Sequence, residues 1–236
     1  MTKVVLVTGC ASGIGYAQAQ YFLKQGYQVY GVDKLDKPNL NGNFNFIKLD
    51  LSSDLSSDLS PLFTMVPSVD ILCNTAGILD AYKPLLEVSD EEVEHLFDIN
   101  FFVTVRLTRH YLRRMVEKKS GIIINMCSIA SFIAGGGGAA YTSSKHALAG
   151  FTRQLALDYA KDCIQIFGIA PGAVQTAMTA SDFEPGGLAE WVASETPIGR
   201  WTKPSEVAEL TGFLASGKAR SMQGEIVKID GGWSLK

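Results

Sequence analysis

Residues 4–15 read VVLVTGCASGIG, a short apolar run followed by a turn rich in glycine. The run predicts a buried strand over residues 3–8, and the apolar spacing of residues 16–25 predicts a helix that ends at Gly26. Glycines let a backbone turn approach a pyrophosphate, and the first turn of a helix presents unpaired N–H groups to it. Strand, glycine turn and helix therefore indicate a dinucleotide site, although the Gly-x-x-x-Gly-x-Gly spacing differs from the more common Gly-x-Gly-x-x-Gly.

A second predicted strand, residues 28–32, is followed directly by Asp33. A carboxylate at this point accepts hydrogen bonds from the adenosine ribose hydroxyls of NAD, and it repels the additional phosphate of NADP. Two unit charges about 4 Å apart interact by about 4 kcal/mol at an effective dielectric of about 20, and Lys34 would offset part of that repulsion. We therefore predict that NAD(H) is preferred over NADP(H).

The remainder of the chain alternates apolar strands with helical patterns. Helices are predicted from Ser89 through Leu112, around Tyr141 and from Pro204, and further strands over residues 46–49, 69–73, 122–127, 164–170 and 225–230. Residues 34–45 show no helical pattern and predict a loop, and the repeat at residues 52–59 predicts a short helix or turn. This alternation predicts an α/β fold, a Rossmann-type doubly wound parallel sheet of about seven strands with helices on both faces, as a single domain over residues 1–236.

Composition and charge limit the functional classes. The chain has 236 residues, 47% of them hydrophobic, and a formal net charge of −3. This balance gives no electrostatic footprint for nucleic acid, and no apolar run approaches the roughly 18 residues that a membrane span needs. The N-terminal run lacks the features of a signal peptide, so we expect a soluble cytoplasmic protein with free thiols. No metal site is expected, because the cysteines and histidines lack ligand spacing.

A candidate acid–base pair lies on the helix predicted around Tyr141. Lys145 follows one helical turn later, so the two side chains share one helix face. An ammonium group beside a phenol favours the phenolate and lowers the tyrosine pKa, which makes the pair a tunable acid or base. Ser128 ends the predicted strand over residues 122–127, and the carboxyl ends of strands face the ligand crevice in open α/β sheets.

Taken in order, these motifs resemble the classical short-chain dehydrogenase/reductase family over nearly the whole chain. The family's Asn-Asn-Ala-Gly motif corresponds to residues 74–77, where Thr75 replaces the second asparagine. The resemblance implies a catalytic tetrad of Asn100, Ser128, Tyr141 and Lys145. It also implies that the cofactor is held by Gly9, Ser12, Gly13, Ile14, Gly15, Asp33, Asp50, Leu51, Asn74, Ala76, Gly77, Tyr141, Lys145, Pro171, Gly172, Val174 and Thr176.

Two other departures from the family pattern lie near the expected pocket. Phe167 stands where an asparagine often precedes the Pro-Gly turn, and residues 135–138 are four consecutive glycines just before Tyr141. Neither departure removes a catalytic group. The glycine run predicts a small and adaptable pocket floor, so a relative's substrate does not transfer to this chain.

The resemblance also implies a mechanism. A hydride passes between the nicotinamide and a carbonyl carbon, while Tyr141 donates a proton to the oxygen and Ser128 hydrogen-bonds that oxygen. Lys145 would hold the nicotinamide ribose and lower the pKa of Tyr141. Asn100 would hold a water that connects Lys145 to solvent.

The substrate is left open between two classes of small molecule. Reduction of 3-oxoacyl thioesters is the best-represented activity among similar proteins, and a basic cluster could dock an acyl carrier protein: Arg113, Arg114, Lys118 and Lys119. An NAD-dependent diol, polyol or dihydrodiol dehydrogenase is equally compatible. Residues 177–200 predict a mobile segment over the pocket, and its apolar side chains favour a substrate with an apolar body and one polar end: Met178, Phe183, Leu188 and Trp191.

Two further classes share parts of this pattern. A nucleotide-sugar epimerase or dehydratase resembles the extended branch of the family, with a different glycine spacing and a longer C-terminal substrate domain, and this chain has neither. A regulatory protein that senses NAD without turnover is the second, although such proteins usually lack a member of the tetrad.

Oligomerisation is predicted from the apolar content of two helices. They carry more apolar residues than one face of a sheet can cover, namely Phe101, Phe102, Tyr111 and Leu112 on one helix and Phe151, Leu155 and Tyr159 on the other. Relatives commonly pair these helices, so we expect a homo-oligomer, specifically a tetramer.

Overall fold

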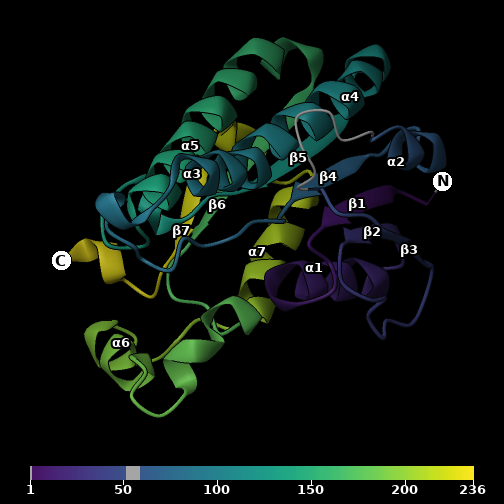
Figure 1. The fold of residues 1–236 in the computed structure, drawn as a ribbon. Helices are drawn as coiled ribbons and strands as arrows, with labels where there is room; N and C mark the ends of the chain where they lie inside the picture. The colour runs from purple at the N-terminus through teal and green to yellow at the C-terminus, as the bar shows by residue number, and fades with distance from the viewer. Residues whose placement is uncertain (1, 52–58) are drawn as a thin grey trace.

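A seven-stranded parallel sheet forms the centre of the structure (Figure 1). The computed structural model describes residues 2–51 and 59–236. The strand order is β3-β2-β1-β4-β5-β6-β7, and the strands are β1 (Val4–Thr8), β2 (Gln28–Asp33), β3 (Phe44–Lys48), β4 (Ile71–Asn74), β5 (Gly121–Met126), β6 (Ile164–Pro171) and β7 (Ile226–Ile229). The predicted doubly wound parallel sheet is confirmed.

Helices cover both faces of this sheet (Figure 1). On one face α1 (Gly13–Lys24) packs beside α7 (Pro204–Ala215), and on the other lie α2 (Ser60–Met65), α4 (Val103–Lys118) and α5 (Ala139–Tyr159). Val5 and Val7 join the core beneath α1 and α7, whereas Leu6, between them, joins the core beneath α4. Because both sides of each central strand are buried, these strands are continuous apolar runs.

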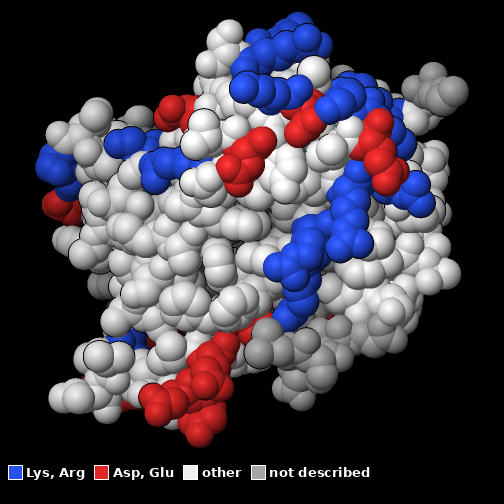
Figure 2. Space-filling model, turned by 90° about the horizontal axis from the view of Figure 1, so that it is seen from above, with Lys and Arg blue, Asp and Glu red and all other residues white. Residues whose placement is uncertain are grey.

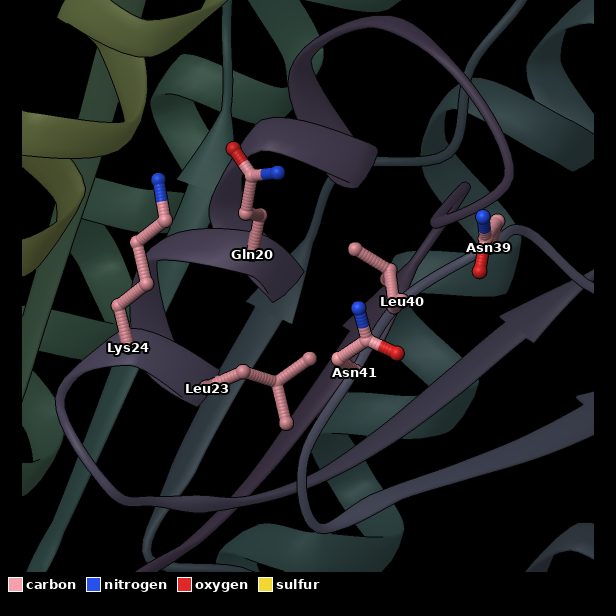
Figure 3. A pocket seen from close by; sticks show the side chains of 6 residues that line it. All are labelled: Gln20, Leu23, Lys24, Asn39, Leu40 and Asn41. Carbon is pink, nitrogen blue, oxygen red and sulfur yellow. The ribbon is translucent and has the colours of Figure 1, made fainter.

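The crossover from β2 to β3 is a loop, as predicted, with no helix in residues 34–43. A hollow of about 180 Å³ lies between this loop and α1 (Figure 3), lined by Gln20, Leu23, Lys24, Asn39, Leu40 and Asn41. No candidate site residue lines this hollow. The repeat predicted as a short helix or turn lies outside the described residues, apart from Leu59.

The long helix expected from Ser89 through Leu112 is interrupted. Its capping box is confirmed, because Glu92 N donates to Ser89 Oγ and Ser89 N donates to the Glu92 carboxylate. After α3 (Asp90–Phe97), however, the chain forms a π-helical turn, η2 (Asp98–Phe102), before α4 begins. Such turns occur frequently at functional sites, and this one carries Asn100.

Burial also corrects part of the expected oligomer surface. Tyr111 is fully buried and Leu112 nearly so, because both pack against the sheet in the core beneath α4. They therefore contribute no surface to an interface. Phe102 remains exposed, and the Phe101 and Phe151 rings contact each other edge-on, with centroids 5.8 Å apart, between η2 and α5.

No helix in the part of the chain that the structure describes is long and apolar enough to cross a membrane. Within the same residues, no group of three His, Cys, Asp or Glu side chains is placed to hold a metal ion. Cys10, Cys73 and Cys127 are buried and Cys163 is exposed, and all four are free thiols.

Candidate active site

The strand order reverses at β1, which lies between β2 and β4. In open α/β sheets, ligands bind at this switch point, in the crevice beyond the carboxyl ends of the strands. The segments that leave these ends carry the residues expected to bind the cofactor: they follow Thr8, Asp33, Asn74, Met126 and Pro171.

The glycine turn after β1 fits a dinucleotide by its backbone geometry. Gly9 and Gly13 have φ values of +70° and +53°, a region that favours glycine. A Cβ on Gly15 would lie 2.1 Å from Gly9 O, so no side chain can be accommodated there. Helix α1 follows Ser12 without a side-chain cap, which leaves its positive end suited to a pyrophosphate.

Asp33 is fixed beside this turn. Its Oδ2 accepts a hydrogen bond from Ala11 N at 2.9 Å, and its Oδ1 accepts one from Leu35 N at 3.0 Å. Burial, together with the charge of Asp33, raises the pKa of the neighbouring Cys10 thiol to about 12, so this thiol stays protonated. A carboxylate is therefore held at the end of β2, where a ribose-binding acid is expected.

The segment after β4 is fastened to β1 by one hydroxyl. Thr8 Oγ1 accepts hydrogen bonds from Thr75 N at 2.9 Å and from Ala76 N at 3.0 Å. The Thr75 hydroxyl donates to Gln18 Oε1 in α1 at 2.6 Å, so threonine at this unusual position links the segment to the helix. This network holds Ala76 against Gly9, where a Cβ on Gly9 would lie 3.0 Å from Ala76 Cα.

Asn74 turns its side chain into the sheet. Its Nδ2 donates to Asn125 Oδ1 at 2.9 Å and to Thr108 Oγ1 at 3.2 Å, which ties β4 to β5 and α4. The amide nitrogen is thus engaged within the protein. A contact between Asn74 and the cofactor stays a prediction.

The segment after β6 closes over the glycine turn. Thr176 lies so near Gly13 that a Cβ on Gly13 would be 3.2 Å from the threonine Cβ. Val174 is buried and pairs with Thr202 in an isolated bridge, and Gly172 is packed against Asp230. The expected cofactor residues from β1 and β6 therefore meet at one place. After β3, Asp50 is exposed and Leu51 is buried.

Ser128, Tyr141 and Lys145 come together at the end of β5. Ser128 precedes the short helix η3 (Ile129–Ser131), and its Oγ accepts from Ala130 N at 3.1 Å. Tyr141 and Lys145 lie in the first turns of α5 and are both buried. Lys145 Nζ lies 5.5 Å from the centroid of the Tyr141 ring and donates to Met126 O at 2.9 Å.

Burial sets the protonation states of this pair. It raises the pKa of Tyr141 to about 12, and Tyr82, Asp80 and Cys127 add to the rise, while a hydrogen bond with Ser128 opposes it. Burial lowers the pKa of Lys145 to about 8. The net shift of the Tyr141 pKa is therefore upward, because the loss of hydration is its largest cause. A lowering contribution from Lys145 stays a prediction. Tyr141 is a protonated acid at neutral pH.

Asn100 holds the segment after Gly77. Its Nδ2 donates to Ile78 O at 2.9 Å and to Ser144 Oγ at 3.3 Å, and its Oδ1 accepts from Ile78 N at 2.8 Å. A Cβ on Gly77 would lie 3.1 Å from Asn100 Oδ1 and 3.7 Å from Lys145 Nζ. Gly77 therefore lets Asn100 and Lys145 approach each other. A water between Asn100 and Lys145 stays a prediction.

Asp80, in the loop after β4, is a site residue that the sequence pattern did not predict. Its carboxylate accepts hydrogen bonds from Gly138 N at 2.8 Å and from Tyr141 N at 2.9 Å, at the start of α5. One feature of the sequence indicates that the cap of this helix comes from elsewhere: Gly138 precedes the helix and has no side chain with which to cap it.

Residues 177–200 form two short helices beside the site, η5 (Ala177–Phe183) and α6 (Ala189–Glu195). Trp201 Nε1 donates to Ala189 O at 2.9 Å, and Lys236 Nζ forms an ion pair with Glu195 at 2.7 Å. Five large apolar side chains of this segment are exposed, the four expected ones and one more: Met178, Phe183, Leu188, Trp191 and Ile198. The mobility expected for this segment stays a prediction.

Comparison with known proteins agrees with this geometry. Residues 3–186 match the family model described as short chain dehydrogenase. The 3beta-hydroxysteroid dehydrogenase 2 of Eggerthella lenta is 32% identical over 246 residues, which cover 98% of this chain and 95% of that protein. The 2-dehydro-3-deoxy-D-gluconate 5-dehydrogenase of Formosa agariphila is 31% identical over 248 residues, covering 98% and 92% respectively. A solved structure of 4-hydroxyisoleucine dehydrogenase complexed with NADH is similar with a TM-score of 0.92 at 31% identity and covers 100% of both chains.

Proposed function

The chain belongs to the short-chain dehydrogenase family and is an NAD(P)-dependent oxidoreductase acting on an alcohol or a ketone, and from this premise we propose that it uses NAD(H) on a substrate with an apolar body. The observation that supports the chemistry is the grouping of Ser128, Tyr141 and Lys145 at the end of β5, where Lys145 Nζ lies 5.5 Å from the Tyr141 ring centroid and is held by Met126 O. The apolar body is inferred from the exposed side chains of residues 177–200.

The chain's own residues would handle the proton. Nicotinamide dinucleotide, when bound, supplies or accepts the hydride. In reduction, Tyr141 Oη donates its proton to the carbonyl oxygen, and Ser128 Oγ hydrogen-bonds the same oxygen. Lys145 Nζ, already oriented by Met126 O, would bind the nicotinamide ribose. In alcohol oxidation the proton moves in the opposite direction, from the substrate hydroxyl to Tyr141.

The preference for NAD(H) follows from Asp33. Calorimetry should give tighter binding of NADH than of NADPH, because the carboxylate repels the additional phosphate. In Asp33→Asn the dissociation constant of NADPH divided by that of NADH should fall about tenfold or more. Asp36→Asn is the matched control, since Asp36 is exposed and pairs only with Lys48 among the ion pairs of the described residues. Equal affinities of the unchanged protein for NADH and NADPH would contradict this proposal.

The substrate class is tested by comparing kcat/KM for a medium-chain 3-oxoacyl thioester with that for a small polyol. We expect at least about a tenfold preference for the thioester, because its apolar chain can contact Met178, Phe183 and Trp191. A preference for the polyol would overturn the apolar assignment and favour the diol or polyol dehydrogenase alternative, but it would leave the oxidoreductase itself intact. Absence of turnover on a broad panel would instead favour an NAD-sensing protein.

An acyl carrier protein is a second candidate partner, favoured by surface charge. Lys and Arg side chains form a band on the face seen from above, where α4 and α5 lie (Figure 2). Arg113, Arg114, Lys118 and Lys119 are exposed at the C-terminal end of α4, although Arg114 pairs with Glu117 and Lys119 pairs with Asp162. An acidic carrier would be attracted to the net positive charge that remains.

We also propose a homotetramer. Phe102, next to Phe101 in η2, and Leu157, in α5, are exposed, and apolar side chains on neighbouring helices are typical of an interface.

A further inference from the structure

Helix α5, which carries Tyr141 and Lys145, has no cap of its own. Its N-cap residue is Gly138, and its first turn contains no acidic residue. The cap comes from Asp80, 58 residues earlier, whose Oδ1 accepts from Gly138 N at 2.8 Å. The second oxygen, Oδ2, accepts from Tyr141 N at 2.9 Å. One carboxylate thus satisfies two backbone donors at the positive end of the helix.

The space around Gly138 is shaped for this carboxylate. A Cβ on Gly138 would lie 2.6 Å from Asp80 Oδ2 and 2.8 Å from Lys83 O. Any larger residue at this position would therefore displace the carboxylate. The φ of Gly138 is −72°, so its backbone conformation alone does not require glycine. The glycine is needed because Asp80 occupies the place of a side chain.

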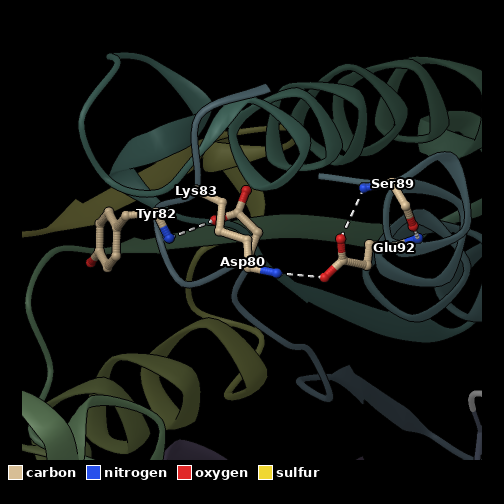
Figure 4. Close-up of polar contacts among 5 residues, drawn as sticks. All are labelled: Asp80, Tyr82, Lys83, Ser89 and Glu92. Carbon is tan, nitrogen blue, oxygen red and sulfur yellow. Dashed lines mark hydrogen bonds and ion pairs between the residues drawn. The ribbon is translucent and has the colours of Figure 1, made fainter. Parts of the chain in front are cut away.

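Residues 80–83, which we call the strap, are held in an unusual conformation. Ala81 and Tyr82 have φ values of +53° and +58°, in the left-handed region that non-glycine residues rarely adopt. Asp80 Oδ1 also accepts from Tyr82 N at 3.3 Å, within the strap (Figure 4). At the other end, Lys83 forms an ion pair with Glu92 at 2.6 Å, in the capping box of α3. The strap is thus fastened to both helices.

We propose that Asp80 is a positioning residue for proton transfer, because its carboxylate fixes the first turn of α5 and thereby the place of the Tyr141 hydroxyl. This inference rests on the proposed function of Tyr141 as the proton donor. Backbone strain is typical of functional sites, and here the strained strap contacts that first turn through the Asp80 carboxylate. The hydrogen bond between Asp80 and Tyr141 involves the backbone nitrogen of Tyr141 and not the hydroxyl that transfers the proton.

The carboxylate has a second effect, on the charge around Tyr141. The titratable and polar groups that face Tyr141 are Asp80 and Tyr82 from the strap, Cys127 and Ser128 after β5, and Lys145 from α5. The negative charge of Asp80 raises the pKa of Tyr141, whereas the Ser128 hydrogen bond lowers it. Removal of this charge should therefore lower the pKa of the acid.

The test is Asp80→Asn, which keeps the shape but leaves one acceptor oxygen and no charge. We expect kcat for ketone reduction to fall about tenfold, with the dissociation constant of NADH unchanged within about twofold. The alkaline loss of reduction rate should begin at lower pH than in the unchanged protein, because Tyr141 then deprotonates earlier. Asp90→Asn is the matched control: Asp90 is an exposed acid in the first turn of α3, and its loss removes the same charge without these effects.

Amide hydrogen exchange gives a measurement that is independent of turnover. The amides of Gly138 and Tyr141 should exchange at least about tenfold faster in Asp80→Asn and at unchanged rates in Asp90→Asn. If Asp80→Asn does not fold, Gly138→Ala takes its place, because its Cβ displaces the same carboxylate. Unchanged exchange together with an unchanged kcat and pH profile would overturn the proposal. Faster exchange in a protein that reduces no ketone would leave the cap correct but reject the proposed function.

Discussion

Tyr141→Phe should lower kcat for ketone reduction at least about 100-fold, while NADH still binds. The substitution keeps the buried ring and removes only the hydroxyl proton. Burial raises the pKa of Tyr141 to about 12, so nearly every molecule carries this proton at neutral pH and the loss falls on the whole population. The Ser128 hydroxyl accepts from Ala130 N and keeps its own proton free to donate to the substrate oxygen, which accounts for a residual rate. The measurement is steady-state reduction followed by NADH absorbance, with calorimetry for NADH.

The matched control is Tyr159→Phe, at the opposite end of the same helix. It deletes the same hydroxyl at the end of α5 away from Tyr141 and should leave kcat within about twofold. If Tyr141→Phe retained near-normal turnover, another group would have to supply the proton. The assignment of Tyr141 would then be wrong, whatever the fold.

The fold followed from local patterns in the sequence. A buried strand precedes Gly9 and a helix follows it, and this alternation repeats along the chain. It predicted the parallel sheet, because the apolar pattern of each strand and helix can be recognised within about ten residues. The place of Ser128 in the ligand crevice then follows, since parallel strands end at one edge of the sheet. Its grouping with Tyr141 and Lys145, which lie on a helix, was implied by the resemblance to the family. The absence of a helix between β2 and β3 could also be predicted, because residues 34–43 show no helical pattern of apolar residues.

The remaining features depend on contacts between distant residues. The π-turn that carries Asn100 could not be seen, because the partner of its amide is the backbone of Ile78, in another segment. Asp80 caps α5 across 58 residues, and no periodicity in the sequence records that pairing. The upward shift of the Tyr141 pKa arises from burial, which depends on the packing of the whole site.

Lys145→Met should nearly abolish turnover and yet stabilise the protein at neutral pH. Turnover should fall at least about 100-fold, because the group proposed to hold the nicotinamide ribose is removed. Stability should rise because Lys145 is buried and its pKa is lowered from 10.5 to about 8. A shift of this size corresponds to about 3 kcal/mol of penalty for the charged form. The substituted side chain would leave Met126 O without its donor, which offsets part of the gain, so we expect about 1–2 kcal/mol.

The sign of the pH dependence makes this prediction specific. Between about pH 8 and pH 10.5 the unfolded chain holds the lysine proton and the folded chain does not, so the stability of the unchanged protein rises with pH in this window. The penalty is fully present below pH 8 and is lost as pH approaches 10.5, so the advantage of Lys145→Met should shrink over the same window. Urea denaturation at several pH values measures both trends, with Lys161→Met as an exposed control on the turn after α5. A variant that is less stable than the unchanged protein at pH 7 would show that the buried amine carries no such penalty, and that packing around Met126 O dominates instead.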